Sequence, residues 1–276
     1  MTAPLTFALN HIAAPKLRFA AFAGLARELG IDQVEIRNDL PGVEIADGTD
    51  PAAVKAAAEA AGVRVLTINA LYPFDVWNDE LAAKAEQLAA YAAACGATAL
   101  VLCPLNSRED ERSAAERAND LKTSLEALLP ILRRHEITGL VEPLGFAECS
   151  LRTKRAAIDA IDAVGGASQF KLLHDTFHHH LASEQEFFPE RTGLVHISGV
   201  EDRNLALNAI RDAHRVLVGP ADRLGNVAQI RALRAGGYAG PFSMEPFAES
   251  VHALHDPASA LRESFSFVAR EVGTTA

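Results

Sequence analysis

The feature that most constrains the fold is an alternation of short apolar runs with longer amphipathic runs, which repeats eight times along 276 residues. Each apolar run is brief and nearly continuous, as expected of a strand buried on both faces. Eight such units, with no composition break or Ser/Gly-rich linker, predict an α/β (β/α)8 TIM barrel that forms a single domain over residues 1–276. The predicted strands are Phe7 to Asn10, Val34 to Ile36, Val65 to Asn69, Ala99 to Cys103, Gly139 to Glu142, Phe170 to His174, Leu194 to Ile197 and Phe242 to Glu245.

The segments between these runs have the spacing and the end signals of helices. Asp50-Pro51 and Asp256-Pro257 each place an N-cap acceptor before a proline at the first helical position. Gly62 and Gly96 fall just past predicted helix ends, where a left-handed residue is favoured. The clearest apolar helix face is formed by Leu81, Ala85, Leu88, Ala92 and Cys95.

A doubly wound open sheet is the alternative architecture for the same alternation. That fold would favour a glycine-rich phosphate loop after the first strand. The residues from Asn10 to Pro15 contain no G-x-G-x-x-G motif. Binding of a dinucleotide cofactor in the Rossmann manner is therefore disfavoured.

Charge and cysteine usage exclude several classes of function. The net charge of −10 repels a phosphate backbone and anionic lipid headgroups, so we expect neither nucleic acid nor a membrane as partner. A metal-dependent endonuclease on a related barrel is disfavoured for the same reason. Cys95, Cys103 and Cys149 form no C-x-x-C pair. Without a signal-like N-terminus or a membrane-length apolar run, the sequence predicts a cytoplasmic protein.

Four ligand-type side chains end the last four predicted strands. Glu142, Asp175, His196 and Glu245 stand at consecutive strand ends, and in a barrel of this kind those ends form the active-site face. Three bare carboxylates at one point would repel one another unless a cation neutralised them. We therefore predict one divalent metal ion, Mn²⁺, Co²⁺, Mg²⁺ or Zn²⁺. The alternative for each acid is a helix cap or an ion pair.

Further polar residues follow other strands. His178 stands three residues after Asp175 and is a candidate for orienting the substrate, the alternative being a solvated loop histidine. A second set of residues could line a polyol pocket: Glu35, Arg37, Asn69 and His11. For Glu35 and Arg37 the alternative is pairing with neighbouring side chains at the barrel rim. Trp77, the only tryptophan, could close the pocket or pack within its loop.

These residues, over nearly the whole chain, resemble the xylose isomerase-like barrels of sugar isomerases and epimerases. The resemblance is closest to inosose (2-keto-myo-inositol) isomerases, through five segments. They are Glu35-Ile36-Arg37, Leu66-Thr67-Ile68-Asn69-Ala70-Leu71, Glu142-Pro143-Leu144-Gly145, Asp175-Thr176-Phe177-His178 and Met244-Glu245-Pro246-Phe247. It implies the same four metal ligands, with Glu142 and Glu245 also placed for proton transfer.

The resemblance further implies that Arg215 reaches substrate oxygens from the long connection after the seventh strand. About 28 residues, from Ser198 to Gly225, separate that strand from the next predicted helix near Asn226 to Ala235. Long loops in compact domains are usually functional, so we expect this one to cover the substrate. Relatives usually carry a glycine after the proline, whereas Ala221-Asp222-Arg223 follows Pro220 here.

The resulting hypothesis is a metal-dependent isomerase of a cyclic keto-polyol, most closely 2-keto-myo-inositol of inositol catabolism, acting by enediolate proton transfer. A ketose 3-epimerase and an inosose or 3-dehydroshikimate-type dehydratase are the alternatives within the same chemistry. No predicted strand ends in lysine, which disfavours a Schiff-base aldolase. A non-catalytic sugar-binding barrel is the alternative outside enzymes, and a homo-oligomer is left open.

Overall fold

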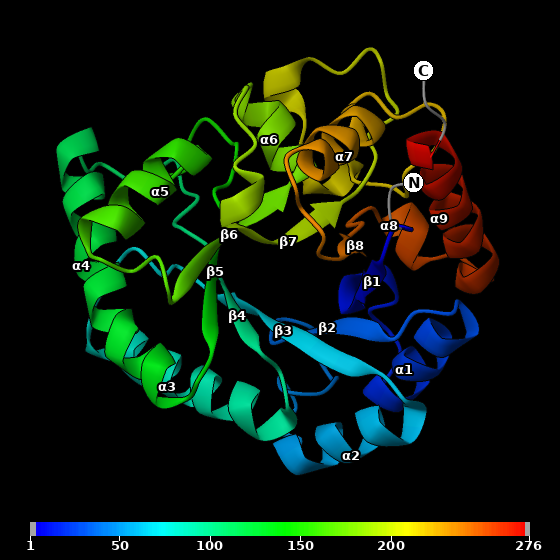
Figure 1. Ribbon diagram of the computed structural model, residues 1–276, viewed down its shortest axis with the longest axis horizontal. Coiled ribbons are helices and arrows are strands. Elements are labelled where there is room, and N and C mark those ends of the chain that lie inside the picture. The colour runs from blue at the N-terminus through cyan, green and yellow to red at the C-terminus, as the bar shows by residue number, and fades with distance from the viewer. Residues whose placement is uncertain (1–3, 274–276) are drawn as a thin grey trace.

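The computed structural model describes residues 4–273 and has eight parallel strands that close into a barrel in chain order, with helices around it (Figure 1). This confirms the predicted (β/α)8 fold class. Every strand pairs in parallel with its two neighbours, and β1 closes the barrel by pairing with β8. The strands are β1 (Phe7–Asn10), β2 (Gln33–Arg37), β3 (Arg64–Leu71), β4 (Ala99–Leu102), β5 (Thr138–Val141), β6 (Phe170–Asp175), β7 (Thr192–Ile197) and β8 (Phe242–Met244).

The helices form the outer layer, and their ends carry the predicted signals. The Asp50 side chain accepts a hydrogen bond from the Ala52 N–H at the start of α2, and Gly62 ends that helix with a φ of 67°. Ser113 and Glu116 form a reciprocal capping box at the start of α4. The helices are α1 (Phe19–Glu28), α2 (Pro51–Ala61), α3 (Asp79–Cys95), α4 (Ala114–Arg134), α5 (Lys154–Ala163), α6 (Thr176–Ala182), α7 (Asn226–Ala235), α8 (Glu249–His252) and α9 (Pro257–Gly273).

Side-chain alternation along the strands sorts residues between two cores. Val141, Val195 and Ile197 belong to the large cluster that the strands share with the outer helices. A separate small cluster contains Leu140, Leu173 and Leu194. Residues two apart along a strand face the same side. Because Leu140, Leu173 and Leu194 point into the barrel, the residues two positions after them also point inward. The barrel interior is thus apolar at one end and receives Glu142, Asp175 and His196 at the other.

The long connection between β7 and α7 is anchored on both sides. Gly199 and Val216 exchange two backbone hydrogen bonds of 2.7 and 2.8 Å. Asp222 accepts hydrogen bonds from the Val200 and Leu224 N–H groups, and Arg223 donates to the Leu205 carbonyl. The residues that replace the glycine expected after Pro220 therefore hold this segment in place.

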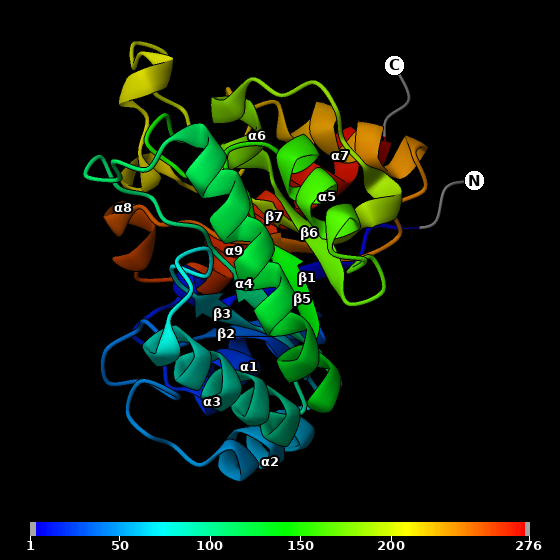
Figure 2. The same cartoon turned by 90° about the vertical axis from the view of Figure 1, so that its left-hand side faces the viewer.

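Figure 2 shows that part of this connection, drawn in yellow, projects from the same side of the barrel as α8. Both segments follow the carboxyl ends of strands, as the active-site loops of such barrels do. Within residues 4–273, no helix combines the length and the apolar character that crossing a membrane requires.

Acid should weaken the fold through His179. Lys154 Nζ lies 2.7 Å from His179 Nδ1 and 2.6 Å from Glu184 Oε2, and the His174 and His180 rings are the other titratable groups facing His179. Burial and the charge of Lys154 lower the pKa of His179 to about 3. This histidine is therefore neutral in the folded chain and takes up a proton on unfolding between pH 6.5 and 3. Its contribution to the free energy of unfolding falls by about 1.4 kcal/mol per pH unit as the pH drops through that window.

We expect His179→Asn, which keeps an acceptor near Nδ1, to flatten the dependence of unfolding free energy on pH over this window. Urea titrations at a series of pH values measure the effect. An equal slope in the variant and the parent chain between pH 6 and 4 would contradict the assignment.

Candidate metal centre

Glu142, Asp175, His196 and Glu245 meet at the carboxyl ends of β5, β6, β7 and β8. One ligand atom from each lies within 4.8 Å of the others, and all four side chains are buried. Strand register accounts for this convergence, because Asp175 pairs with His196 and Ile197 pairs with Met244, the residue before Glu245. The Glu142 and Glu245 N–H groups still bond to the neighbouring strands, at Leu102 and Ile197.

Asp175 combines both roles that its position allows. Its Oδ1 accepts hydrogen bonds from the Phe177 and His178 N–H groups, at 2.7 and 3.4 Å, and so caps α6. Its Oδ2 faces the cluster and accepts a 2.7 Å bond from Arg215 Nη2. The capping alternative and the ligand prediction therefore describe different oxygens of one carboxylate.

The orientation of His196 is fixed by Glu35, which is fully buried behind it. His196 Nε2 lies 3.0 and 3.1 Å from the two Glu35 oxygens. Thr67, Asn69 and Ser243 also donate to Glu35, so its carboxylate is surrounded by donors. With its proton on Nε2, the ring presents Nδ1 to the other three ligands. A carboxylate behind a histidine ligand is the usual arrangement in metal sites, because it sets the tautomer and raises the basicity of the ligand nitrogen.

The two glutamates have different surroundings. Asn10 and Arg37 donate to Glu245 Oε1, and Arg215 donates to Oε2 at 2.9 Å. Burial by itself raises the pKa of Glu245, but His196 and the two guanidinium groups lower it below its usual range. Glu142 instead accepts one hydrogen bond, from Cys103 Sγ at 3.3 Å.

The protonated Cys103 thiol suits this contact. Burial and the Glu142 carboxylate raise the pKa of Cys103 well above its usual value, so the sulfur keeps its proton and donates it. The Glu142 carboxylate thus has no guanidinium partner among the described residues, and a thiol orients one of its oxygens.

The donor set fits a divalent cation. His196 Nδ1 is buried without a hydrogen-bond partner in the described chain, although it lies 3.0 Å from Glu245 Oε2 and 3.6 Å from Glu142 Oε1. Burial lowers the pKa of His196, but Glu245 and Glu35 outweigh burial and raise it well above its usual value. An unpartnered ring nitrogen among three carboxylates is the ligand geometry that a metal ion of the Mn²⁺, Co²⁺, Mg²⁺ or Zn²⁺ type accepts.

A cavity of about 240 Å³, here called the inner cavity, opens beside these ligands. Of the residues predicted to contact substrate, Arg37, Asn69, His178 and Arg215 line it together with Glu142 and Glu245. His178 is buried, and its Nδ1 has no partner among the described residues. The structure therefore brings these predicted residues to one place.

Arg215 is almost fully buried and is held by the site itself. Besides its bonds to Asp175 and Glu245, its Nε donates to Ser198 and its Nη1 to Asp212. Its guanidinium also lies between the rings of Phe177 and Phe247, at 4.8 and 4.7 Å. In this structure Arg215 neutralises two ligand carboxylates at the edge of the inner cavity.

Glu35 and His11 lie away from this lining. Glu35 is enclosed beneath His196, as described above. The His11 ring stacks on Phe22 with centroids 4.3 Å apart, and its Nε2 lies 2.8 Å from the Leu17 carbonyl. Trp77 packs against the main apolar core. Glu35 therefore pairs with a neighbouring side chain, and Trp77 packs within the fold, as the alternatives to substrate contact had it.

Eight lining residues were not predicted to contact substrate: Ala70, Tyr72, Cys103, Asn106, Leu144, Phe146, Asp212 and Phe247. Cys103 and Tyr72 directly follow the ends of β4 and β3, so the same criterion extended to thiol and aromatic side chains finds them. Phe146 and Phe247 lie further along their loops, where the sequence contains no periodic signal.

The comparisons with known proteins agree with this geometry. The family model described as xylose isomerase-like TIM barrel matches residues 23–271. The chain belongs to this family. No curated protein sequence matches it.

Three similar solved structures cover nearly the whole chain. A xylose isomerase domain-containing protein from Salmonella typhimurium LT2 is 34% identical, with a TM-score of 0.89 and 99% of each chain covered. The IolI protein with a bound zinc atom is 18% identical, with a TM-score of 0.85, over 98% of this chain and 100% of that one. D-Psicose 3-epimerase from Clostridium cellulolyticum H10, solved with D-tagatose, is 14% identical, with a TM-score of 0.76, over 98% and 100%.

Glu35→Gln should weaken metal binding although Glu35 is not a ligand. The amide keeps the size of the side chain but removes the charge that holds the His196 Nε2 proton, so we expect metal affinity to fall about 10- to 100-fold. Competition with a metal-binding dye, using Zn²⁺ and Mn²⁺, measures this. Glu44→Gln is the matched control, because Glu44 is also buried but caps α1 through the Phe19 N–H. Equal affinities in both variants would show that Glu35 only supports the fold.

Proposed function

We propose that this protein is a metal-dependent isomerase of cyclic keto-polyols, with 2-keto-myo-inositol of inositol catabolism as substrate. The observation that carries the proposal is the position of Glu142 and Glu245. Both belong to the four-residue ligand cluster and both line the inner cavity. The IolI protein of the same fold holds a zinc atom, and two epimerases are among the similar structures.

The proposed site residues supply binding, orientation and proton transfer. Glu142, Asp175, His196 and Glu245 would hold one divalent ion, which when bound polarises adjacent carbonyl and hydroxyl oxygens of the substrate. Arg37, Asn69 and His178 present hydrogen-bonding groups to the remaining hydroxyls. The rings of Tyr72 and Phe247 offer apolar contact to the faces of a polyol ring.

Proton transfer falls to the two glutamates. A carboxylate beside the C–H between two oxygens can remove that proton and return it to the neighbouring carbon through an enediolate. The surroundings of Glu245 keep it ionised and fixed by Asn10, Arg37 and Arg215. Glu142 Oε2 accepts from the Cys103 thiol, and Oε1 lies 3.6 Å from His196 Nδ1 without a guanidinium partner in the described chain, so Glu142 is held less tightly than Glu245.

Activity on a substrate panel tests the proposal directly. Chelator-treated protein, reloaded separately with Mn²⁺, Co²⁺, Zn²⁺ or Mg²⁺, would be incubated with inososes and ketoses and the products identified. We expect interconversion of keto-inositols that depends on added metal and is lost in His196→Gln. Turnover of a ketose with inversion at C3 would favour the epimerase alternative, and loss of water would favour the dehydratase. Full activity without metal would reject the metal-dependent mechanism.

Reaction in D₂O should place deuterium at the carbon that loses its carbonyl, because a carboxylate exchanges its proton with solvent. Glu142→Gln and Glu245→Gln should each lower kcat by about 10²- to 10⁴-fold, beyond any loss explained by metal content measured on the same samples. Mass spectrometry at low conversion and steady-state kinetics provide the two readouts. Retained activity in both glutamine variants would reject the assignment.

A further inference from the structure

A second cavity lies beside the inner cavity and takes no part in the mechanism above. This side cavity has a volume of about 470 Å³, within the range of small-molecule sites. Three segments from the carboxyl-end loops enclose it: the loop after β5, the end of α6 and the long connection after β7. Its lining consists of Gly145, Phe146, Ala147, Glu148, Arg152, Leu181, Ala182, Ser183, Leu207, Asn208, Ile210 and Arg211.

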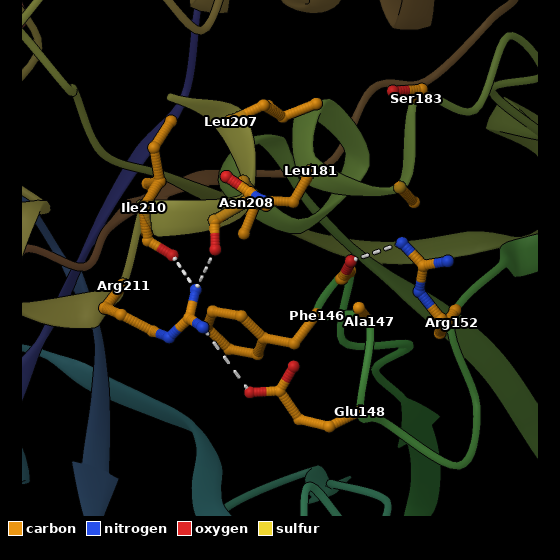
Figure 3. Close-up of a pocket in the computed structure, with 12 residues that line it drawn as sticks. Phe146, Ala147, Glu148, Arg152, Leu181, Ser183, Leu207, Asn208, Ile210 and Arg211 are labelled. Carbon is orange, nitrogen blue, oxygen red and sulfur yellow. Dashed lines mark hydrogen bonds and ion pairs between the residues drawn. The ribbon is translucent and has the colours of Figure 1, made fainter. Parts of the chain in front are cut away.

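The apolar part of the side cavity is rigid on one side and open on the other. Phe146, Leu181 and Ile210 are buried and belong to one small core cluster. Leu207 faces them and is 39% exposed, one of three large apolar side chains exposed in residues 4–273. Figure 3 shows Phe146, Leu181 and Leu207 around the same space. An apolar ring placed there would cover Leu207 and rest on a fixed floor.

The two guanidinium groups of the cavity differ in what neutralises them. Arg211 donates to the Asn208 and Ile210 carbonyls, and its Nη2 lies 3.7 Å from Glu148 Oε1. Glu148 is also 3.7 Å from Arg108, so its negative charge already faces two arginines.

Arg152 is the unneutralised charge. Within the described chain, Arg152 is exposed, donates one hydrogen bond to the Gly145 carbonyl and takes part in no ion pair. Figure 3 shows Arg152 on the opposite side of the view from Arg211. Its remaining N–H groups face solvent at the edge of the cavity, where they are available to a carboxylate or phosphate oxygen.

We propose that the side cavity binds a small molecule that has an apolar ring and one anionic group, a carboxylate or a phosphate. The ring lies against Leu181 and Leu207, next to Phe146, whose ring has the Arg211 guanidinium 5.6 Å from its centroid, and the anion accepts hydrogen bonds from Arg152. This proposal does not depend on the reaction catalysed at the inner cavity.

The two cavities share a wall. Phe146 lines both, and its ring lies edge-on to His178 with centroids 5.2 Å apart. The segment that contributes Leu207 and Arg211 to the side cavity continues directly into Asp212 and Arg215 of the inner cavity. The side cavity and the inner cavity are therefore lined by one continuous stretch of chain.

Isothermal titration calorimetry with three probes tests the proposal on the full chain. Benzoate and phenyl phosphate carry the ring and an anion, whereas benzamide has the ring without the charge. We expect one anionic probe or both to bind at a single site, with the tighter one identifying the preferred anion, and benzamide to bind about tenfold more weakly or not at all. No binding of either anionic probe up to about 10 mM would overturn the proposal.

Variants locate the bound probe. Arg152→Gln should weaken binding at least about fivefold through loss of the charged donor, and Ala147→Phe, at an exposed position, should abolish it by filling the cavity. Arg64→Gln, on an exposed arginine at the start of β3, is the matched control and should bind as the parent chain does. Circular dichroism melting verifies that each variant is folded. Unchanged binding in both Arg152→Gln and Ala147→Phe would place the probe elsewhere, at the metal ligands for example, and would overturn the proposal.

Discussion

Repulsion among three buried carboxylates is the constraint on which the rest of the site depends. Glu142, Asp175 and Glu245 are brought together by the parity of strands that must bury Leu140 and Leu173 on the same inner face. The backbone cannot separate them without breaking barrel register, so the charge must be balanced in place. Arg37 and Arg215 supply part of that balance, and His196 supplies more while its Nδ1 carries a proton. A bound metal ion would take the place of that proton.

This balance explains why so much of the surrounding polar structure is rigid. Arg215 is among the largest fully buried side chains of the described chain and is fixed by four hydrogen-bonding partners and two aromatic rings. Glu35 is likewise enclosed by donors on several strands. Such preorganised groups lose little freedom when substrate binds, which is how a site keeps its geometry through a reaction.

The fold and the convergence of the four candidate ligands could be predicted from sequence because both depend on local patterns. Continuous apolar runs mark the strands, and the first polar residue after such a run marks its carboxyl end. Glu35 shows where this reasoning stops, because its contact with His196 spans 161 residues and depends on the order in which the barrel closes. The thiol contact to Glu142 depends on side-chain rotamers, and the two contacts of Asp175 depend on which of its oxygens faces α6. The hydrophobic periodicity of the sequence carries no information about either.

The wall shared by the two cavities also bears on how this barrel can change. Residues 205–215 form a short module that contributes to both surfaces, so exchanging it for the equivalent segment of another barrel would alter two environments in one step. The loop after β5 does the same through Phe146. Altering one cavity alone would require starting from residues that only it uses, such as Tyr72 at the inner cavity or Ser183 at the side cavity. In this architecture, a change of sequence in the shared segments alters the ligand preferences of both cavities together more easily than it alters one of them alone.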